Sequence, residues 1–280
     1  MKTERLPFGV LLRRWRERRR MTQAELALAT ESSTRHLSCL ETGKTQPSRA
    51  MVARLSEHLG IPLRDQNTLL LTAGFAPAFS ERPIDELAAA KTAIERILRA
   101  HRPYPAFAVD RHWNLVSSNL ALPQLYEGCS PELLREPANA LRLILHPAGL
   151  GPRIVNFAAW RAHSLSVLRQ QVEARADPVI AALSMEIAGY PIPTGSEAFA
   201  GFDAAQCLAT PLRIATRFGT LAFLNTVTVF GTPHDLTLAE IALEMLFPAD
   251  EQTIEIVRRM LAEAGAPAAP GSATPRSEQA

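Results

Sequence analysis

Residues 22–48 read TQAELALATESSTRHLSCLETGKTQPS, and the N-terminal region is best understood from this stretch outward. Thr22 stands where a helix cap is favourable, and Glu25, three residues later, completes a capping box. Ser33 starts a second short helix, which ends where Gly43 supplies a left-handed C-terminal residue. Two short helices joined by a tight turn predict a helix–turn–helix, whose second helix enters the major groove of DNA.

The second helix of this pair has two distinct faces. Leu37 and Leu40 lie on one side, the pattern of a helix that packs against a core. A hairpin used only for packing would not need a polar outer face and basic flanking segments, so DNA binding is the favoured interpretation. The residues expected on the outward face are Thr34, Arg35, His36, Ser38 and Cys39.

The spacing TQ-x-EL…LE-x-GK-x-x-PS resembles the repressor/Cro-type helix–turn–helix of the xenobiotic-response-element family, over residues 1–75. The resemblance implies that Thr34, Arg35 and Cys39 face the bases, with His36 and Ser38 beside them. The phosphate-facing positions that it implies are Gln23, Lys44, Thr45 and Gln46.

The chain departs from this family at the turn, where Glu31 and Ser32 replace the usual glycine and hydrophobic residue. A non-glycine residue at positive φ costs roughly 1 kcal/mol. The sequence therefore defines the two helices better than the turn between them.

Charge is distributed unevenly along the 280 residues. Residues 1–75 contain 13 Lys and Arg against 7 Asp and Glu, a net charge of +6, whereas the remainder contains 17 against 21, a net charge of −4. Arginines crowd the segment from Arg13 to Arg20, where they can steer the protein onto phosphates. A basic N-terminal region followed by an acidic remainder is typical of a nucleic-acid-binding protein with a separate second function.

The chain is long enough for two domains. Residues 1–75 predict an all-α five-helix domain, and the proline-punctuated segment 75–83 marks its end. The expected organisation is a helix–turn–helix domain at 1–75, a linker and connecting helix at 76–100, an α+β domain at 101–265 and a disordered tail at 266–280.

The second domain mixes strands and helices. Alternation of residue types predicts a long strand at 221–230, where Leu221, Phe223 and Val227 share one face with Asn225. The other predicted strands are 106–109, 113–116 and 207–215, and the predicted helices are 84–100, 120–126, 137–145, 153–175, 178–187 and 250–264. This order predicts an α+β domain with a small antiparallel sheet and helices over one face.

Four segments resemble the MmyB-like transcription regulators, in the same order across both domains: STRHLSCLETGKTQPS, RPYPAFAVDRHWNLVSSN, ALRLILHPAGLGPRIVNFAAWRAH and FGTPHDLTLAEIALEMLFPAD. The resemblance covers most of the chain, and it is specific because a common helix–turn–helix would not bring the LHP…RIVN…W block with it. It implies that the second domain is PAS-like and binds a small hydrophobic molecule, with a fatty acid as the example.

Some residues of the second domain suit a ligand that carries a carboxylate. Arg142 and His146 are four residues apart, so a helix places both on one face. Arg153 and Asn156 stand where the next helix starts, and free backbone N–H groups there favour an anion. The alternative is that these residues join helices and that the apolar residues near them are core. The candidate ligand-binding residues are Arg142, His146, Arg153, Asn156, Phe157 and Trp160, with Leu141, Ile144, Leu145 and Ile154 as further apolar lining.

The sequence contains no motif of catalysis or metal binding: it has no HExxH, no Cys/His zinc spacing, no GxSxG and no P-loop. Its three cysteines lie far apart, and no apolar run reaches the ~18 residues of a membrane helix. We therefore expect a cytoplasmic protein that does not associate with membranes. We expect no catalytic residues, no metal site and no cofactor other than a bound fatty acid or similar apolar ligand.

The favoured hypothesis is a sequence-specific transcription regulator that binds a double-stranded DNA operator and senses a small apolar, fatty-acid-like ligand. A homodimer is expected because two-fold operators are read by paired recognition helices ~34 Å apart. Two other hypotheses stay open. The second domain would be a protein-interaction module in one and an enzyme fused to a DNA-binding domain in the other.

Overall fold

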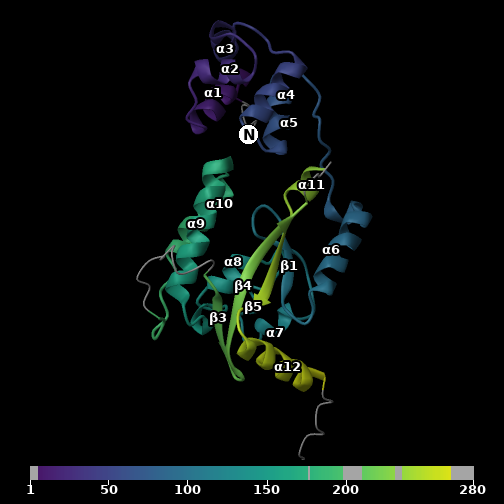
Figure 1. Cartoon of the computed structure of the whole chain (residues 1–280), viewed down its shortest axis with the longest axis vertical. Coiled ribbons are helices and arrows are strands. Elements are labelled where there is room, and N and C mark those ends of the chain that lie inside the picture. Colours follow the sequence, from purple (N-terminus) through teal and green to yellow (C-terminus); the bar gives the residue numbers. More distant parts are fainter. Residues whose placement is uncertain (1–5, 176, 198–209, 231–234, 266–280) are drawn as a thin grey trace, which may run out of the picture.

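The computed structural model describes residues 6–175, 177–197, 210–230 and 235–265. Within them the chain forms an all-helical N-terminal domain and an α+β second domain, which confirms the predicted fold class. Figure 1 shows the two domains one above the other, joined by an extended segment. No helix in this part of the chain is long and apolar enough to cross a membrane. The tail predicted at 266–280 lies outside the described residues.

Five helices make up the N-terminal domain: α1 (Phe8–Arg18), α2 (Gln23–Ala29), α3 (Thr34–Glu41), α4 (Arg49–His58) and α5 (Leu63–Thr72). Side-chain caps set where three of them begin. Thr22 and Glu25 form the capping box of α2, and the Ser33 and Ser48 hydroxyls accept backbone hydrogen bonds at the starts of α3 and α4. The predicted helix–turn–helix is therefore confirmed, with α3 as its recognition helix.

The turn between α2 and α3 closes as a Schellman motif with a non-glycine residue at its left-handed position. Glu31 has a φ of 51°. The Ser32 amide donates to the Ala27 carbonyl at 2.8 Å, and the Glu31 amide donates to the Leu28 carbonyl at 3.2 Å. The turn thus keeps its geometry despite the departure from the family pattern, and Glu31 carries the backbone cost.

Replacing Glu31 by Gly should stabilise the N-terminal domain by about 1 kcal/mol, because glycine adopts positive φ without a steric penalty. Gly43 offers the matched control. It has a φ of 72°, and nothing lies within 4 Å of where a Cβ would stand, so Gly43→Ala should impose a similar cost. Hydrogen exchange of the α3 amides measures both free energies of unfolding. An unchanged value for Glu31→Gly would contradict the proposed strain.

A buried ion pair joins the first three helices. Glu41 is the last residue of α3, and its side chain is 3% exposed. Arg16 of α1 donates to its two carboxylate oxygens at 2.6 and 3.0 Å. Gln23 of α2 donates to Glu41 Oε2 at 2.8 Å. One carboxylate therefore fixes the recognition helix to both α1 and α2.

The second domain is built on a five-stranded antiparallel sheet in the order β2-β1-β5-β4-β3. The strands are β1 (Ala106–Val109), β2 (Leu115–Ser118), β3 (Leu212–Thr216), β4 (Gly219–Val229) and β5 (Ala242–Pro248). Side chains alternate between the two faces. In β5, Leu243 lies on one face of the sheet, whereas Glu244 and Leu246 lie on the opposite face.

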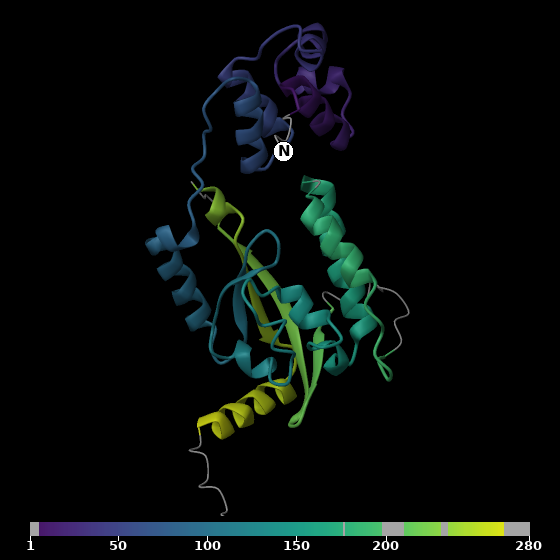
Figure 2. The ribbon, with the colours of Figure 1, turned by 180° about the vertical axis from the view of Figure 1, so that it is seen from behind.

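Helices cover both faces of the sheet, which corrects the expectation of one covered face. On one side α6 (Ala88–Ala100), predicted as a connecting helix, packs Ile94 and Leu98 against Ala106, Ala108 and Leu243. The α8 (Ala140–Leu145) and α9 (Phe157–Arg175) helices cover the other side, and α10 (Pro178–Ala188) packs on α9. Figure 2 shows α6 and the α9–α10 pair on opposite sides of the sheet.

Shorter elements complete the second domain. They are η1 (Ile84–Glu86), α7 (Leu122–Leu125), η2 (Gly151–Arg153) and α11 (Leu236–Ala239), and α12 (Glu251–Gly265) lies against β4. The long helix predicted from residue 153 begins later, at Phe157, because a 3₁₀ turn precedes it.

The segment between the domains is held at both ends by side chains. Asn67 of α5 donates to the Phe79 carbonyl at 2.7 Å and accepts from two backbone amides of the segment. Asp235, which caps α11, accepts from the Ser80 hydroxyl at 2.9 Å and from Arg82 at 3.1 Å. The irregular boundary segment is therefore tied to α5 on one side and to α11 on the other.

Candidate ligand cavity and DNA-binding face

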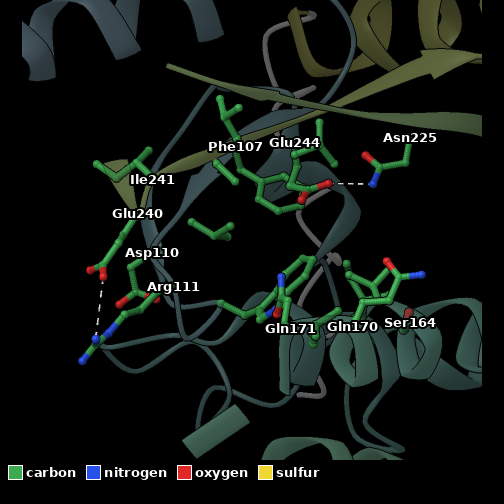
Figure 3. A pocket seen from close by; sticks show the side chains of 18 of the residues that line it. Phe107, Asp110, Arg111, Ser164, Gln170, Gln171, Asn225, Glu240, Ile241 and Glu244 are labelled. Carbon is green, nitrogen blue, oxygen red and sulfur yellow. Dashed lines mark hydrogen bonds and ion pairs between the residues drawn. The ribbon is translucent and has the colours of Figure 1, made fainter. Parts of the chain in front are cut away.

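A cavity of about 430 Å³ lies between the sheet and helix α9. Figure 3 shows side chains that line it. Strands β1, β4 and β5 form one wall, α8 and α9 form the other, and the β1–β2 turn and the residues after α11 border it. Mostly apolar pockets with a few polar groups are typical of small-molecule sites. The apolar lining includes Phe107, Val109, Trp113, Leu141, Ile144 and Trp160.

One carboxyl group lies on this largely apolar wall. Glu244 stands within β5 and is 2% exposed, and its Oε2 accepts from Asn225 Nδ2 at 2.6 Å. Burial raises the pKa of Glu244 above its usual range, and the hydrogen bond from Asn225 offsets only part of that effect. No lysine or arginine of the described residues forms an ion pair with it. The neutral acid is therefore favoured more strongly than for an exposed glutamate.

Two further polar atoms at the cavity have no hydrogen-bond partner among the described residues. They are Trp160 Nε1, on a residue that is 4% exposed, and Asn225 Oδ1. The Trp160 ring lies 5.2 Å from the ring of His163, measured between centroids, and burial lowers the pKa of His163. Both atoms are buried with almost no accessible surface, and since buried polar atoms are normally paired, this donor and this acceptor are unsatisfied within the described part of the chain.

Charged residues border the cavity on the side of the N-terminal domain. Arg111 and Glu240 approach to 3.7 Å between nitrogen and oxygen, and Arg175 also lines the cavity. Glu240 accepts two hydrogen bonds from Arg64 of α5, at 2.9 and 3.0 Å. The carboxylates of Glu240 and Glu81 raise the pKa of Arg64 above its usual range. An ionic network therefore runs from the cavity to the N-terminal domain.

Arg142 and His146, two of the predicted ligand-binding residues, lie outside this cavity. Arg142 forms a two-pronged ion pair with Glu186 of α10, at 2.7 and 2.9 Å, and these bonds hold the pKa of Glu186 below its usual range. His146 Nδ1 accepts from a backbone amide at 3.0 Å, and its ring packs edge-on against Tyr190. Both contacts match the alternative role of joining helices.

The next three candidates are also engaged by the protein. Arg153 donates to two backbone carbonyls at the end of α7. Asn156 ties the start of α9 to β3 by donating to the Pro211 carbonyl at 2.8 Å, and Phe157 is 1% exposed within the core. Of the six residues predicted to bind ligand, Trp160 is the one that lines the cavity. Its neighbours in the predicted lining, Leu141 and Ile144, do so as well.

Comparison with known protein families accounts for both domains. Residues 90–260 match the model of the MmyB-like transcription regulator ligand binding domain, and residues 7–69 match a helix-turn-helix domain model. The first match alone covers more than half of the chain. The chain belongs to the MmyB-like transcription regulators.

Comparison with individual proteins adds little to this assignment. A search of curated proteins finds no match for this MmyB-like regulator. Among solved structures it is similar to the clp gene regulator ClgR from Corynebacterium glutamicum, with 29% identity over 34% of this chain and 90% of that chain. The TM-score is 0.21.

The DNA-binding domain of this MmyB-like regulator presents a polar face along α3. Thr34 and Arg35 are exposed, while His36, Ser38 and Cys39 are half-buried opposite the core leucines. Lys44, Thr45 and Gln46 are exposed directly after the helix. Gln23 is half-buried and hydrogen-bonded to Glu41. Eight of the nine predicted DNA-binding residues thus lie in or just after α3, and the ninth contacts it.

The polar residues of the cavity escaped the sequence interpretation, although the sequence held a signal for two of them. Asn225 interrupts the apolar face of a predicted strand, and Glu244 interrupts the apolar run ALEMLF. A polar residue at a core position is often functional. Arg111 stands in the polar turn after β1, and Glu240 directly follows α11, so neither interrupts a strand. Among the described residues, no group of three or more His, Cys, Asp or Glu could hold a metal ion.

Proposed function

We propose that this MmyB-like regulator binds its operator as a homodimer through α3, and that a small apolar, fatty-acid-like molecule in the cavity changes its operator affinity. The observation that carries the proposal is the cavity of about 430 Å³ between the sheet and α9. It supplies a largely apolar interior, and the arginines among its described lining residues, Arg111 and Arg175, stand at its border.

For DNA, the proposal assigns base contacts to Thr34, Arg35 and Cys39, with His36 and Ser38 beside them, and phosphate contacts to Gln23, Lys44, Thr45 and Gln46. The exposed polar face of α3 supports it, because a recognition helix reads bases through such a face. The homodimer follows from the two-fold symmetry of operators that paired recognition helices read.

For the ligand, the proposal places the apolar chain against Trp160, Leu141 and Ile144 and a carboxylate near Arg111 and Arg175. An arginine fork suits a carboxylate, and these two arginines border the cavity. Arg142 already binds Glu186 and Arg153 binds backbone carbonyls, so their replacement would disturb helix contacts first.

The ionic network supplies a physical route between ligand and DNA. An anion that binds Arg111 competes with Glu240 for that guanidinium, and Glu240 is also the partner of Arg64 in the DNA-binding domain. A ligand shifts DNA affinity only if its contacts differ between the two states. The Arg111–Glu240–Arg64 chain is where such a difference can arise.

The proposal is tested with dodecanoic acid as a probe on the full chain after lipid extraction. Fluorescence of Trp113 and Trp160, which line the cavity, should report its binding. Affinity for an operator selected from random DNA should change by about 5–150-fold when the probe saturates, the usual range of allosteric coupling.

Two variants of β4 serve as a matched pair in this experiment. Val227 lines the cavity and is itself 56% exposed, whereas Thr228 lies on the opposite face of the same strand. Val227→Trp should fill the cavity and abolish both probe binding and its effect on DNA, and Thr228→Trp should leave both intact. Equal probe affinity in the two variants would contradict binding in this cavity.

A further inference from the structure

The interior of the cavity carries a polar feature that an unsubstituted alkyl chain does not use. Figure 3 shows Glu244 and Asn225 joined by a hydrogen bond at one part of the cavity, and the Arg111–Glu240 pair at another. Glu244 Oε2 accepts from Asn225, which leaves Asn225 Oδ1 without a partner among the described residues. The fatty-acid proposal explains the arginines at the border but not this interior pair.

Placing a plain alkyl chain against this pair would be unfavourable. The ligand would remove water from polar groups and offer no hydrogen bond in exchange, at a cost of about 1–3 kcal/mol for each unsatisfied group. A carboxylate at this position would also be unfavourable, because it would meet the acid of Glu244 without a neighbouring cation. A neutral group that both donates and accepts hydrogen bonds suits the Glu244 acid beside its amide partner Asn225.

We propose that the Glu244–Asn225 pair is a recognition point for a neutral hydroxyl group on the ligand's otherwise apolar chain. The ligand is then an oxygenated fatty-acid-like molecule, with its anionic end near Arg111 and its hydroxyl group in the interior. This inference rests on the proposed function, since it concerns the same cavity, and it specifies the ligand class.

A cationic amine is the competing ligand class, because a carboxylate beside aromatic rings can bind ammonium groups. The arrangement favours the hydroxyl. Arg111 and Arg175 border the cavity and repel a cation, and Glu244 has an amide donor as its neighbour, a partner that serves the neutral acid as well as the carboxylate.

The test uses three probes that share one carboxylate and differ at the far end: dodecanoic acid, its omega-hydroxy derivative and its omega-amino derivative. Binding to the lipid-extracted full chain is measured by calorimetry. The hydroxy acid should bind at least about 10-fold more tightly than dodecanoic acid, the effect of roughly one buried hydrogen bond.

Two substitutions separate hydrogen bonding from charge. Glu244→Gln keeps a neutral donor and acceptor and should retain the preference for the hydroxy acid. Glu244→Leu should reverse the preference, so that dodecanoic acid binds more tightly than the hydroxy acid.

If dodecanoic acid or its omega-amino derivative bound the unmodified protein more tightly than the hydroxy acid does, the inference would be overturned and the proposed function would stand. Failure of all three probes to bind would overturn both. Because the comparison of probes on the unmodified chain needs no substitution, a variant that fails to fold does not obscure the result.

Discussion

Glu41→Ala should lower the free energy of unfolding of the N-terminal domain by about 3–5 kcal/mol, the usual cost of removing one partner of a buried ion pair. The substitution leaves the Arg16 guanidinium, whose side chain is 10% exposed, with the Met21 backbone carbonyl and the Glu17 carboxylate at 3.9 Å in place of its two-pronged partner. Gln23 loses its partner at the same time. Hydrogen exchange of the α1 and α3 amides in the full chain measures the loss without interference from the second domain.

The double variant Arg16→Met with Glu41→Leu distinguishes the ion pair from the space it fills. Apolar replacement of both partners should recover most of the lost stability, because no uncompensated charge then stays buried. If the double variant were as unstable as Glu41→Ala, the penalty would come from packing. A loss below about 1 kcal/mol in Glu41→Ala would show that Arg16 finds water instead.

The helices of the N-terminal domain could be predicted from the sequence because their capping residues act locally. Thr22, Ser33 and Ser48 each satisfy backbone N–H groups within three residues of themselves, so the residues that start a helix are adjacent to the helix they start. The Glu31 turn was less defined, because whether a non-glycine residue adopts positive φ depends on the packing of both helices. In the structure, two backbone hydrogen bonds close the turn with Glu31 at positive φ.

The central strand β5 was not predicted, because its conformation depends on pairing with other strands and not on its local sequence. The sequence of β5, ALEMLFP, is rich in residues that favour helices. It forms a strand because β1 and β4 pair with its two edges, and β1 comes from the other end of the second domain's sequence. Strand preference depends on such context more than helix preference does.

The candidate ligand residues show the same limit. The spacing of Arg142 and His146 cannot reveal Glu186, which lies 44 residues after Arg142 in the sequence. Whether an arginine faces a ligand or a neighbouring acid depends on such distant partners. Their assignment to the ligand stays a prediction, and the geometry favours Arg111 and Arg175.

Arg35→Ala should weaken operator binding by about 1–3 kcal/mol, which is roughly 5–150-fold in affinity. Arg35 is exposed in the first turn of α3, the part of a recognition helix that contacts base edges, and arginine pairs with guanine through two hydrogen bonds. The loss should be confined to specific sequences, with relaxed preference at one base position. Affinities for a selected operator and for its single-base variants, at one fixed salt concentration, measure this directly.

Lys44→Ala is the matched control, since it removes one positive charge a short distance after the same helix. A phosphate contact carries no sequence information, so this variant should weaken specific and non-specific DNA by a similar factor. It should also reduce the slope of log affinity against log salt by about 0.9. A common factor of loss on all DNA in both variants would contradict the assignment of Arg35 to base recognition, because removal of a base contact must change the ratio between sequences.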